Sequence, residues 1–277
     1  MKTFLFALML MPSLAWSQMT FAPNTFNSES RNELDVRLIT ADYKYEEPGL
    51  MQIAGRMNGL SMDYRVPTYL GSSFLLMGGQ YLTGTTYYDG TYQISGERTP
   101  TFEERDYNYS LKLGYGTRVV TAGQSIIDVS ASFARRFHVN EGIHYDREQT
   151  YIYLPLELVM VFPVGTKSTI KFGVEQDVFL SGKNTTKVSQ YYDENDRVYR
   201  QDSGSGSKFS LGYETSALGP VILAQVYVRR WDVADSSKVL ASRKTDGAIL
   251  LYNGRPARYY EPENNTKTVG FSLGSRF

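Results

Sequence analysis

Residues 266–277 read Thr-Lys-Thr-Val-Gly-Phe-Ser-Leu-Gly-Ser-Arg-Phe. In an extended chain Val269, Phe271, Leu273 and Phe277 fall on one face, and small or polar residues fall on the other. Strict alternation of this kind predicts a β-strand that presents one apolar face. The stretch is too short and too regular in its period of two to be read as a helix.

The same alternation recurs along most of the chain and predicts an all-β protein. Ten segments carry it, an even number, as is usual for bacterial single-chain barrels. These segments are about 33–45, 55–66, 73–88, 107–120, 126–140, 150–164, 169–183, 206–217, 221–236 and 266–277.

The connections between these segments differ in length in an ordered way. Short connections at 67–72, 121–125, 165–168 and 218–220 alternate with longer and more polar ones. The long connections are 89–106, 184–205 and 237–265, and the intermediate ones, which fall on the same side, are 46–54 and 141–149. This layout predicts an antiparallel transmembrane β-barrel with short periplasmic turns, long extracellular loops and both termini on the periplasmic side.

The two faces of the strands have the polarity of a membrane barrel, which is apolar outside and polar inside. Every second residue from Ile152 to Phe162 is aliphatic or aromatic, whereas Glu157 lies on the opposite face with Tyr151 and Tyr153. Two features of the sequence fit this barrel pattern less well. Pro155 cannot donate to the ladder of a sheet, and the run Phe74–Met77 is apolar on both faces, which leaves its register open.

The N-terminus is typical of a secretory signal, with Lys2, an apolar run over 4–11 and small residues before Gln18. The apolar run is about half of the roughly 20 residues that a spanning helix needs. We expect a signal peptide over 1–17, with cleavage after Ala15 as the alternative. A periplasmic segment over 18–32 and a barrel over 33–277 would follow.

Composition excludes several other classes of protein. The chain carries 29 Lys and Arg against 29 Asp and Glu, so it offers no basic surface for a nucleic acid. It has no cysteine, and hence no disulfide framework of the kind that stabilises small secreted domains. No apolar stretch is long enough for a membrane helix, and a soluble all-β domain is the remaining rival.

Together these features resemble the outer-membrane β-barrel proteins of Gram-negative bacteria. The resemblance covers the chain after the signal segment and implies contact with outer-membrane lipid, lipopolysaccharide and the assembly machinery of that class. The last strand resembles the signal read by that machinery, through Val269, Phe271, Leu273 and Phe277. Ser275 departs from the pattern, because an apolar or aromatic residue is commoner there.

Charged residues of both signs face inward on this register. They suggest either an ion-pair network that fills a narrow lumen or, as the alternative, a charge-lined selective pore. The candidate lumen charges are Arg37, Asp63, Arg65, Lys112, Arg136, Glu157, Lys171, Glu175, Asp177, Glu214 and Arg229, with Asp35, Arg118, Asp128, Lys208 and Arg276 on the same face.

In length and loop layout the chain also resembles the omptins, which are outer-membrane proteases. That family activates a water with a pair of aspartates and an Asp-His couple at the outer rim. Here the two histidines are His138 and His144, and Asp193-Glu194-Asn195-Asp196 stands on the fourth loop without an Asp-His couple. We interpret the histidines as solvated polar residues and the acidic run as a solvated loop tip rather than a calcium site. No metal or cofactor is expected.

Aromatic and loop residues supply the remaining hypotheses. Trp231 lies near a predicted outer strand end with Tyr87, Tyr88, Tyr107 and Tyr109, as in an interfacial girdle. Within 237–265, Asp246-Gly247 and Asn253-Gly254 are strong hairpin signals. They predict a hairpin prolonged above the membrane, or twelve strands as the alternative, and the apolar run 249–252 is a candidate contact surface.

The sequence therefore predicts a non-enzymatic outer-membrane barrel, either a narrow pore or a structural barrel that displays its loops. The alternatives are a surface enzyme, omptin-like or lipid-modifying, and an adhesin that acts through 184–205 and 237–265.

Overall fold

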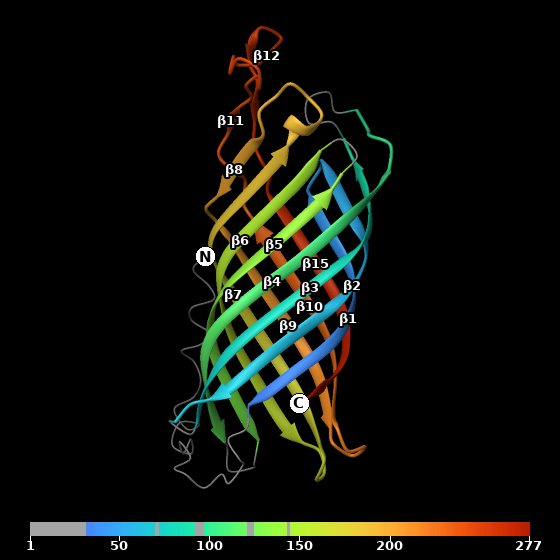
Figure 1. The fold of residues 1–277 in the computed structure, drawn as a ribbon, viewed down its shortest axis with the longest axis vertical. Helices are drawn as coiled ribbons and strands as arrows, with labels where there is room; N and C mark the ends of the chain where they lie inside the picture. Colours follow the sequence, from blue (N-terminus) through green and yellow to red (C-terminus); the bar gives the residue numbers. More distant parts are fainter. Residues whose placement is uncertain (1–31, 70–71, 92–96, 121–124, 143–144) are drawn as a thin grey trace.

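A computed structural model describes residues 32–69, 72–91, 97–120, 125–142 and 145–277. Ten long antiparallel strands, tilted relative to the long axis, form a tall barrel (Figure 1). They are β1 (Glu33–Glu47), β2 (Met51–Pro67), β3 (Ser73–Gly90), β4 (Phe102–Val120), β5 (Ile126–Glu141), β6 (Asp146–Pro163), β7 (Ser168–Lys187), β9 (Gly204–Thr215), β10 (Val221–Val233) and β15 (Asn264–Arg276). Within this part of the chain, no helix is long and apolar enough to cross a bilayer.

The sheet closes on itself, because β1 pairs with β15 and β6 pairs with β7. The predicted ten-strand barrel is confirmed, and the twelve-strand alternative is wrong. The additional strand β8 (Arg197–Gln201) pairs with the upper end of β7 and leads into β9. The predicted signal peptide and residues 18–31 lie outside the described residues, as does His144.

Several strands are longer than their apolar alternation predicted. The expected intermediate loop at 46–54 is wrong, because β1 and β2 pair up to Glu47 and Met51 and leave a tight turn. Similarly, β4 begins at Phe102, β6 begins at Asp146 and β7 continues to Lys187. The ladder continues because backbone pairing needs no apolar side chains, and a strand of about ten residues already spans a bilayer. The upper parts of these strands therefore extend beyond the membrane.

The outer wall carries an apolar belt that ends in a ring of charges. Toward the end with the short turns, the outward residues are apolar and exposed, as at Leu38, Leu113 and Phe133. Further along the same strands the outward residues become charged. This charged ring consists of Asp42, Arg56, Arg105, Arg135, Arg230 and Lys267. The ring marks one edge of the membrane-facing surface, since charges on the lipid face are costly at the midplane and tolerated at the interface.

Both irregular features of the sequence have a local explanation. Pro155 stands where the β5–β6 ladder is interrupted between the pairs Ala131–Leu156 and Ala134–Tyr153, as expected for a residue that cannot donate a ladder hydrogen bond. In the run Phe74–Met77, Phe74 is buried inside the barrel and Met77 is exposed outside, which settles its register.

A bulge disturbs the neighbouring strand pair. Ile152 pairs with Ser181 and Tyr153 pairs with Phe179, so Leu180 of β7 has no partner on β6. Such a bulge shifts the alternation of the strand by one residue. Asp177 below it and Gly182 above it both point inward for this reason.

The long connections form a tower at one end of the barrel, which we call the loop end (Figure 1). The tower contains two small ladders. They are β11 (Val239–Leu240) with β14 (Arg258–Tyr259) and β12 (Leu251–Tyr252) with β13 (Arg255–Pro256). Asn253 and Gly254 form the turn between β12 and β13 with φ values of 50° and 74°, as the hairpin signal predicted.

The acidic run of the fourth loop docks against this tower. Glu194 is buried and accepts two hydrogen bonds from Arg197, and Asp193 accepts hydrogen bonds from the Thr245 backbone and hydroxyl. Asn195 also donates to Ser242 at 2.9 Å. The interpretation of this run as a solvated tip is partly wrong, because Glu194 is buried and Asp193 bonds to the other loop, whereas Asp193, Asn195 and Asp196 are themselves exposed.

Candidate functional site: the filled lumen and the cavity at the loop end

The lumen is filled by layers of side chains, and the layer nearest the short turns is ionic. Arg276 of the last strand contacts Asp35 at 2.7 Å and Glu214 at 3.0 Å. The Asp128 carboxylate forms ion pairs with the guanidinium groups of Arg118 at 2.8 Å and Arg65 at 2.9 Å. Arg65 and Asp128 lie on β2 and β5, which are not neighbours, so this pair crosses the lumen.

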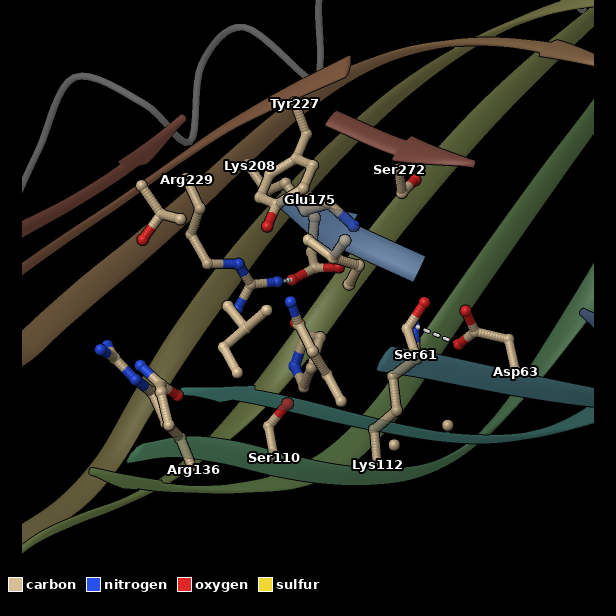
Figure 2. Close-up of a pocket in the computed structure, with 18 of the residues that line it drawn as sticks. Ser61, Asp63, Ser110, Lys112, Arg136, Glu175, Lys208, Tyr227, Arg229 and Ser272 are labelled. Carbon is tan, nitrogen blue, oxygen red and sulfur yellow. Dashed lines mark hydrogen bonds and ion pairs between the residues drawn. The ribbon is translucent and has the colours of Figure 1, made fainter. Parts of the chain in front are cut away.

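A second ionic layer follows at mid-height and surrounds a small cavity of about 100 Å³. Figure 2 shows Arg229 directed at Glu175 and the ammonium of Lys112 directed at Asp63. Lys112 lies 3.5 Å from Asp63 and 3.9 Å from Glu157, and Arg229 also reaches Asp177 at 3.3 Å. Both signs are paired here, as buried charges require.

An aromatic layer lies beyond the two ionic layers. One buried cluster comes from β1, β2, β3 and β10, and a second comes from β5, β6 and β10. The first contains Ile39, Ala41, Tyr43, Tyr45, Ile53, Met57, Leu82 and Tyr227, and the second contains Ala134, Tyr151, Tyr153, Trp231 and Val233. Tyr43 reaches across the lumen to the His138 ring, with 5.5 Å between centroids.

Two glycines make room for the largest rings. A Cβ on Gly206 would lie 2.8 Å from the Trp231 indole, and one on Gly270 would lie 2.5 Å from the Tyr227 ring. These distances are well below ordinary carbon contacts, so the layer depends on residues without side chains at both positions. The apolar filling of the lumen is therefore packed in the manner of a protein core.

A buried polar network lies above the aromatic layer, around His138. Nε2 of His138 lies 2.5 Å from Oδ1 of Asp106, and Nδ1 lies 3.3 Å from Oε1 of Gln149. Thr86 donates to the other oxygen of Asp106, and Asn140 donates to Oδ1 at 3.3 Å. The interpretation of His138 as a solvated residue is wrong, since only 4% of its surface is exposed.

A second network joins the barrel to the tower. Arg147 Nη2 donates to Oε1 of both Glu47 and Glu261, and the Tyr45 hydroxyl lies 2.9 Å and 3.0 Å from the same two oxygens. Burial raises the pKa of Glu261 to about 7; Arg147 opposes this shift and Glu47 adds to it. Glu261 follows β14, the last strand of the tower. Its carboxyl group therefore links the segment that leads from the tower into β15 to the wall of the barrel.

A cavity of about 350 Å³ opens at this network. Glu47, Arg147 and Glu261 contribute to its lining, and Glu104 contributes a carboxylate that accepts a hydrogen bond from Asn140 at 2.9 Å. Aromatic residues are the largest group in the remaining wall. This group includes Tyr88, Phe102, Tyr145, Tyr192, Tyr199, Tyr259 and Tyr260. Among the described residues, no group of three or more acidic or histidine side chains is arranged to hold a metal ion.

The structure brings the predicted lumen charges together in the two ionic layers. Arg136 is buried and lines the same mid-height cavity, but its guanidinium lies toward the aromatic layer, 5.8 Å from the Tyr151 ring centroid. Lys171 contacts Glu214 in the lower layer. Whether these charges line a pore or close one is a question of function.

The predicted aromatic girdle is partly wrong. Tyr87 and Tyr109 are exposed on the outer wall, but Trp231 is 1% exposed inside the barrel and Tyr88 lines the cavity at the loop end. The inward Tyr43 and Tyr45 were also missed. The sequence could have predicted them, because side chains alternate between the two faces of a strand. Tyr43 and Tyr45 stand an even number of positions from the inward Asp35 and Arg37 and therefore share their face.

The residues of the predicted assembly signal lie on the outer wall. Val269, Phe271, Leu273 and Phe277 are 44%, 45%, 50% and 75% exposed. The backbones of Phe277 and Leu34 exchange two hydrogen bonds, which completes the seam between β1 and β15. An assembly role for these residues stays a prediction.

No family model and no curated protein sequence matches the chain. Among solved structures, the outer membrane protease OmpT from Escherichia coli matches with a TM-score of 0.58 and 7% identity, over 89% of this chain and 96% of that one. The toluene transporter TodX of Pseudomonas putida and the β domain of the Bordetella autotransporter BrkA match with TM-scores of 0.35 and 0.34. Their identities are 9% and 13%, over 93% and 87% of this chain and 91% and 98% of theirs. Only the first score is high enough to support a common fold.

The closed antiparallel barrel, its outward apolar belt and its charged interior define an outer-membrane β-barrel protein. The likeness to OmpT supports this class at the level of the fold. At 7% identity it carries no activity over to this chain.

Proposed function

We propose that this protein is a non-conducting outer-membrane barrel that works through its loop end, which faces the cell exterior. The observation that supports the proposal is the packed lumen. Two layers of paired charges and a layer of buried aromatic residues follow one another along the barrel axis. A narrow pore would need a continuous wetted path through all three layers.

The aromatic layer is the strongest barrier. Met57 is 0% exposed, and Trp231, which lines the mid-height cavity, is only 1% exposed. This burial supports a closed aromatic layer. Ions cross an apolar constriction poorly because it cannot replace their hydration. Small solutes would have to displace packed rings rather than flexible surface side chains.

The working part is then the cavity at the loop end, with the docked loops around it. Its aromatic and aliphatic side chains, together with the polar groups that the Arg147 network orients, suit a small-molecule site, which is concave and combines apolar walls with oriented polar groups. The cross-lumen contacts of Arg147 hold Glu47 and Glu261 in place beneath the cavity. This arrangement favours display and binding over transport.

Swelling of liposomes that contain the purified protein tests the closed lumen. We expect no swelling above protein-free liposomes in small sugars, and the same for Val228→Ala, an outward substitution at the same height. The triple variant Lys112→Ala, Arg229→Ala and Trp231→Ala should admit the sugars, because it removes side chains from two layers. Swelling by the unmodified protein at the rate of the triple variant would overturn the proposal.

An adhesin is the second candidate, favoured by the tower itself. Its loops dock through Asp193, Asn195 and Arg243, and its far end exposes Ile249, Leu251 and Tyr252. If this patch mediates adhesion, Leu251→Ser with Tyr252→Ser should reduce the attachment of expressing cells to host surfaces. The control is Lys44→Ser on the exposed wall of the barrel. Equal attachment by all three strains would remove this candidate.

A further inference from the structure

The mid-height cavity of the lumen is lined by one cation that lacks a counter-charge. Arg136 of β5 is 5% exposed and borders this cavity. Among the described residues, no carboxylate oxygen lies within 4.0 Å of its guanidinium, and its Nη1 atom is buried without a hydrogen-bond partner. The guanidinium lies 5.8 Å from the centroid of the Tyr151 ring, and a cation–π contact does not neutralise its charge.

The other cations of the two ionic layers have negative partners. The paired arginines, each within 3.3 Å of a carboxylate, are Arg37, Arg65, Arg118, Arg229 and Arg276. Lys112 and Lys171 are paired as well. Lys208 stands directly opposite Glu175 of the neighbouring strand β7. Arg136 is therefore the exception among the described cations of these layers.

A buried arginine without a counter-charge is unfavourable, and it cannot relieve the cost by losing its proton. A buried lysine or carboxyl group can become neutral, whereas a guanidinium stays charged. Water could satisfy the free N–H group, but it would leave the positive charge uncompensated. Asp106, the acid of the network above, is already engaged by His138 and Asn140. A compensating negative charge would have to come from outside the described residues.

The cavity beside Arg136 has room for a ligand and offers it further donors. Its volume of about 100 Å³ exceeds the space that a single water needs. The indole Nε1 of Trp231 is buried without a hydrogen-bond partner, and Trp231 lines the same cavity. Figure 2 shows Arg136 and Ser110, which are paired across β5 and β4, next to each other on one side of the cavity. Guanidinium and indole N–H groups only donate hydrogen bonds, so a ligand that contacts both must accept them.

We propose that the mid-height cavity binds one small monovalent anion of the size of chloride. Arg136 supplies the opposite charge and a hydrogen bond from Nη1, and the Trp231 indole and the Ser110 hydroxyl are the additional donors of the site. A single charge matches the single unpaired cation, and the desolvation of a multiply charged anion such as phosphate would cost more. Water fills the rest of the cavity, where the Ser272 hydroxyl is also buried without a partner. The anion links the aromatic layer to the ionic layer below it, a role that is independent of the proposed function at the loop end.

Crystallography with bromide tests the proposal, because bromide resembles chloride and scatters X-rays anomalously. The probe is sodium bromide, present while the purified protein refolds in detergent and crystallises. We expect an anomalous peak within hydrogen-bond distance of the Arg136 guanidinium. The peak should be absent from Arg136→Met and persist in Arg135→Met, the matched control, since Arg135 is the adjacent arginine and is exposed on the outer wall. Peaks at exposed cations alone would indicate an adventitious ion only and would overturn the proposal, and this result can be read from the unmodified protein even if Arg136→Met does not fold.

Thermal unfolding in sodium chloride and in sodium gluconate of equal ionic strength gives a second test in solution. Gluconate is too large for the cavity, and equal ionic strength keeps the screening of surface charges the same. We expect the unfolding midpoints of the unmodified protein and of Arg135→Met to be about 5 °C higher in chloride, because a ligand that binds only the folded state stabilises it. Arg136→Met should unfold at the same temperature in both salts. Equal midpoints for the unmodified protein would mean that the cavity holds water alone, and an equal rise in Arg136→Met would be a general salt effect; either result would contradict the anion site.

Discussion

At the scale of single residues, Trp231 distinguishes a filled lumen from an aromatic girdle. Its indole packs edge-on against Tyr153, with 4.8 Å between centroids, and lies 5.9 Å from Tyr151. A girdle tryptophan would instead face lipid at the interface. The position of this one side chain therefore reports on the whole aromatic layer.

Tryptophan fluorescence of the chain that begins at Gln18 tests this position, because Trp231 is then the only tryptophan. We expect blue-shifted emission that lipids brominated along their acyl chains do not quench. Tyr109→Trp introduces an outward indole near the interface and serves as the positive control. Quenching of Trp231 to the extent of that control would place it on the lipid side.

His138 and Asp106 are expected to stabilise the fold rather than to catalyse a reaction. Removing either residue leaves the other buried without its hydrogen-bond partner. This lowers the free energy of unfolding by about 1–3 kcal/mol, and by more if the remaining group is charged. We expect His138→Ala to lower the free energy of unfolding by that amount, which appears as a lower urea midpoint. An enzyme would behave differently, since His138→Ala would abolish a measurable hydrolytic activity while the midpoint stayed unchanged.

Glu261 should make the attachment of the tower depend on pH. Its folded pKa of about 7 lies above the ordinary 4.5, so the folded state holds the proton more tightly than the open state does. The resulting stabilisation is complete below about pH 4.5 and is lost as pH rises through 7. A tenfold difference in proton affinity is worth about 1.4 kcal/mol, so the loss amounts to a few kcal/mol at most.

Hydrogen exchange of residues 258–264, corrected for the intrinsic pH dependence of exchange, measures this effect. Protection should fall between pH 4.5 and 7 in the unmodified protein and stay level in Glu261→Gln. Exchange of the β3–β4 ladder is the internal control and should not change. A rise in protection over the same interval would contradict the assigned direction of the pKa shift.

At the scale of the elements, the last strand closes the barrel and ends at Phe277. Deleting Phe277 removes one exposed aromatic ring and the two backbone hydrogen bonds with Leu34, while the rest of the β1–β15 ladder remains. The lost burial is worth about 1–3 kcal/mol, and a barrel with a closed ladder should remain folded after this loss.

We therefore expect the Phe277 deletion to insert poorly in cells and yet to keep most of its thermal stability after refolding in detergent. Quantitative blotting of outer-membrane fractions and thermal unfolding of the refolded protein measure the two effects. The control is Val269→Ala, which trims the same face inside the strand. Normal outer-membrane levels of the deletion variant would show that Phe277 has no part in assembly.

The sequence predicted the strands well but not their ends. Alternation is a local property, so the ten strands and the outward faces of segments such as 150–164 could be read directly. Strand ends such as Glu47 were missed because polar residues continue the ladder beyond the membrane. Cross-lumen partners such as Arg147 and Glu47 are 100 residues apart, and no local pattern joins them.

At the scale of the whole molecule, the barrel has a lower part that lies in the membrane and an upper part that extends beyond it. The lower part presents an apolar belt to lipid and fills its lumen with paired charges and rings. The upper part uses the extended strands, β8 and the docked loops to form the cavity at the loop end. Binding at that end then requires no passage through the barrel, so the two halves can serve separate purposes.

Conductance across a planar bilayer tests the central claim that the lumen is closed. The account predicts that the purified, heat-modifiable protein gives no reproducible channels at any voltage the bilayer tolerates, and that Lys171→Glu and Arg229→Glu are equally silent when folded. Reproducible channels from the unmodified protein, with an ion selectivity that shifts on Lys171→Glu or Arg229→Glu, would show that the charged layers line a pore.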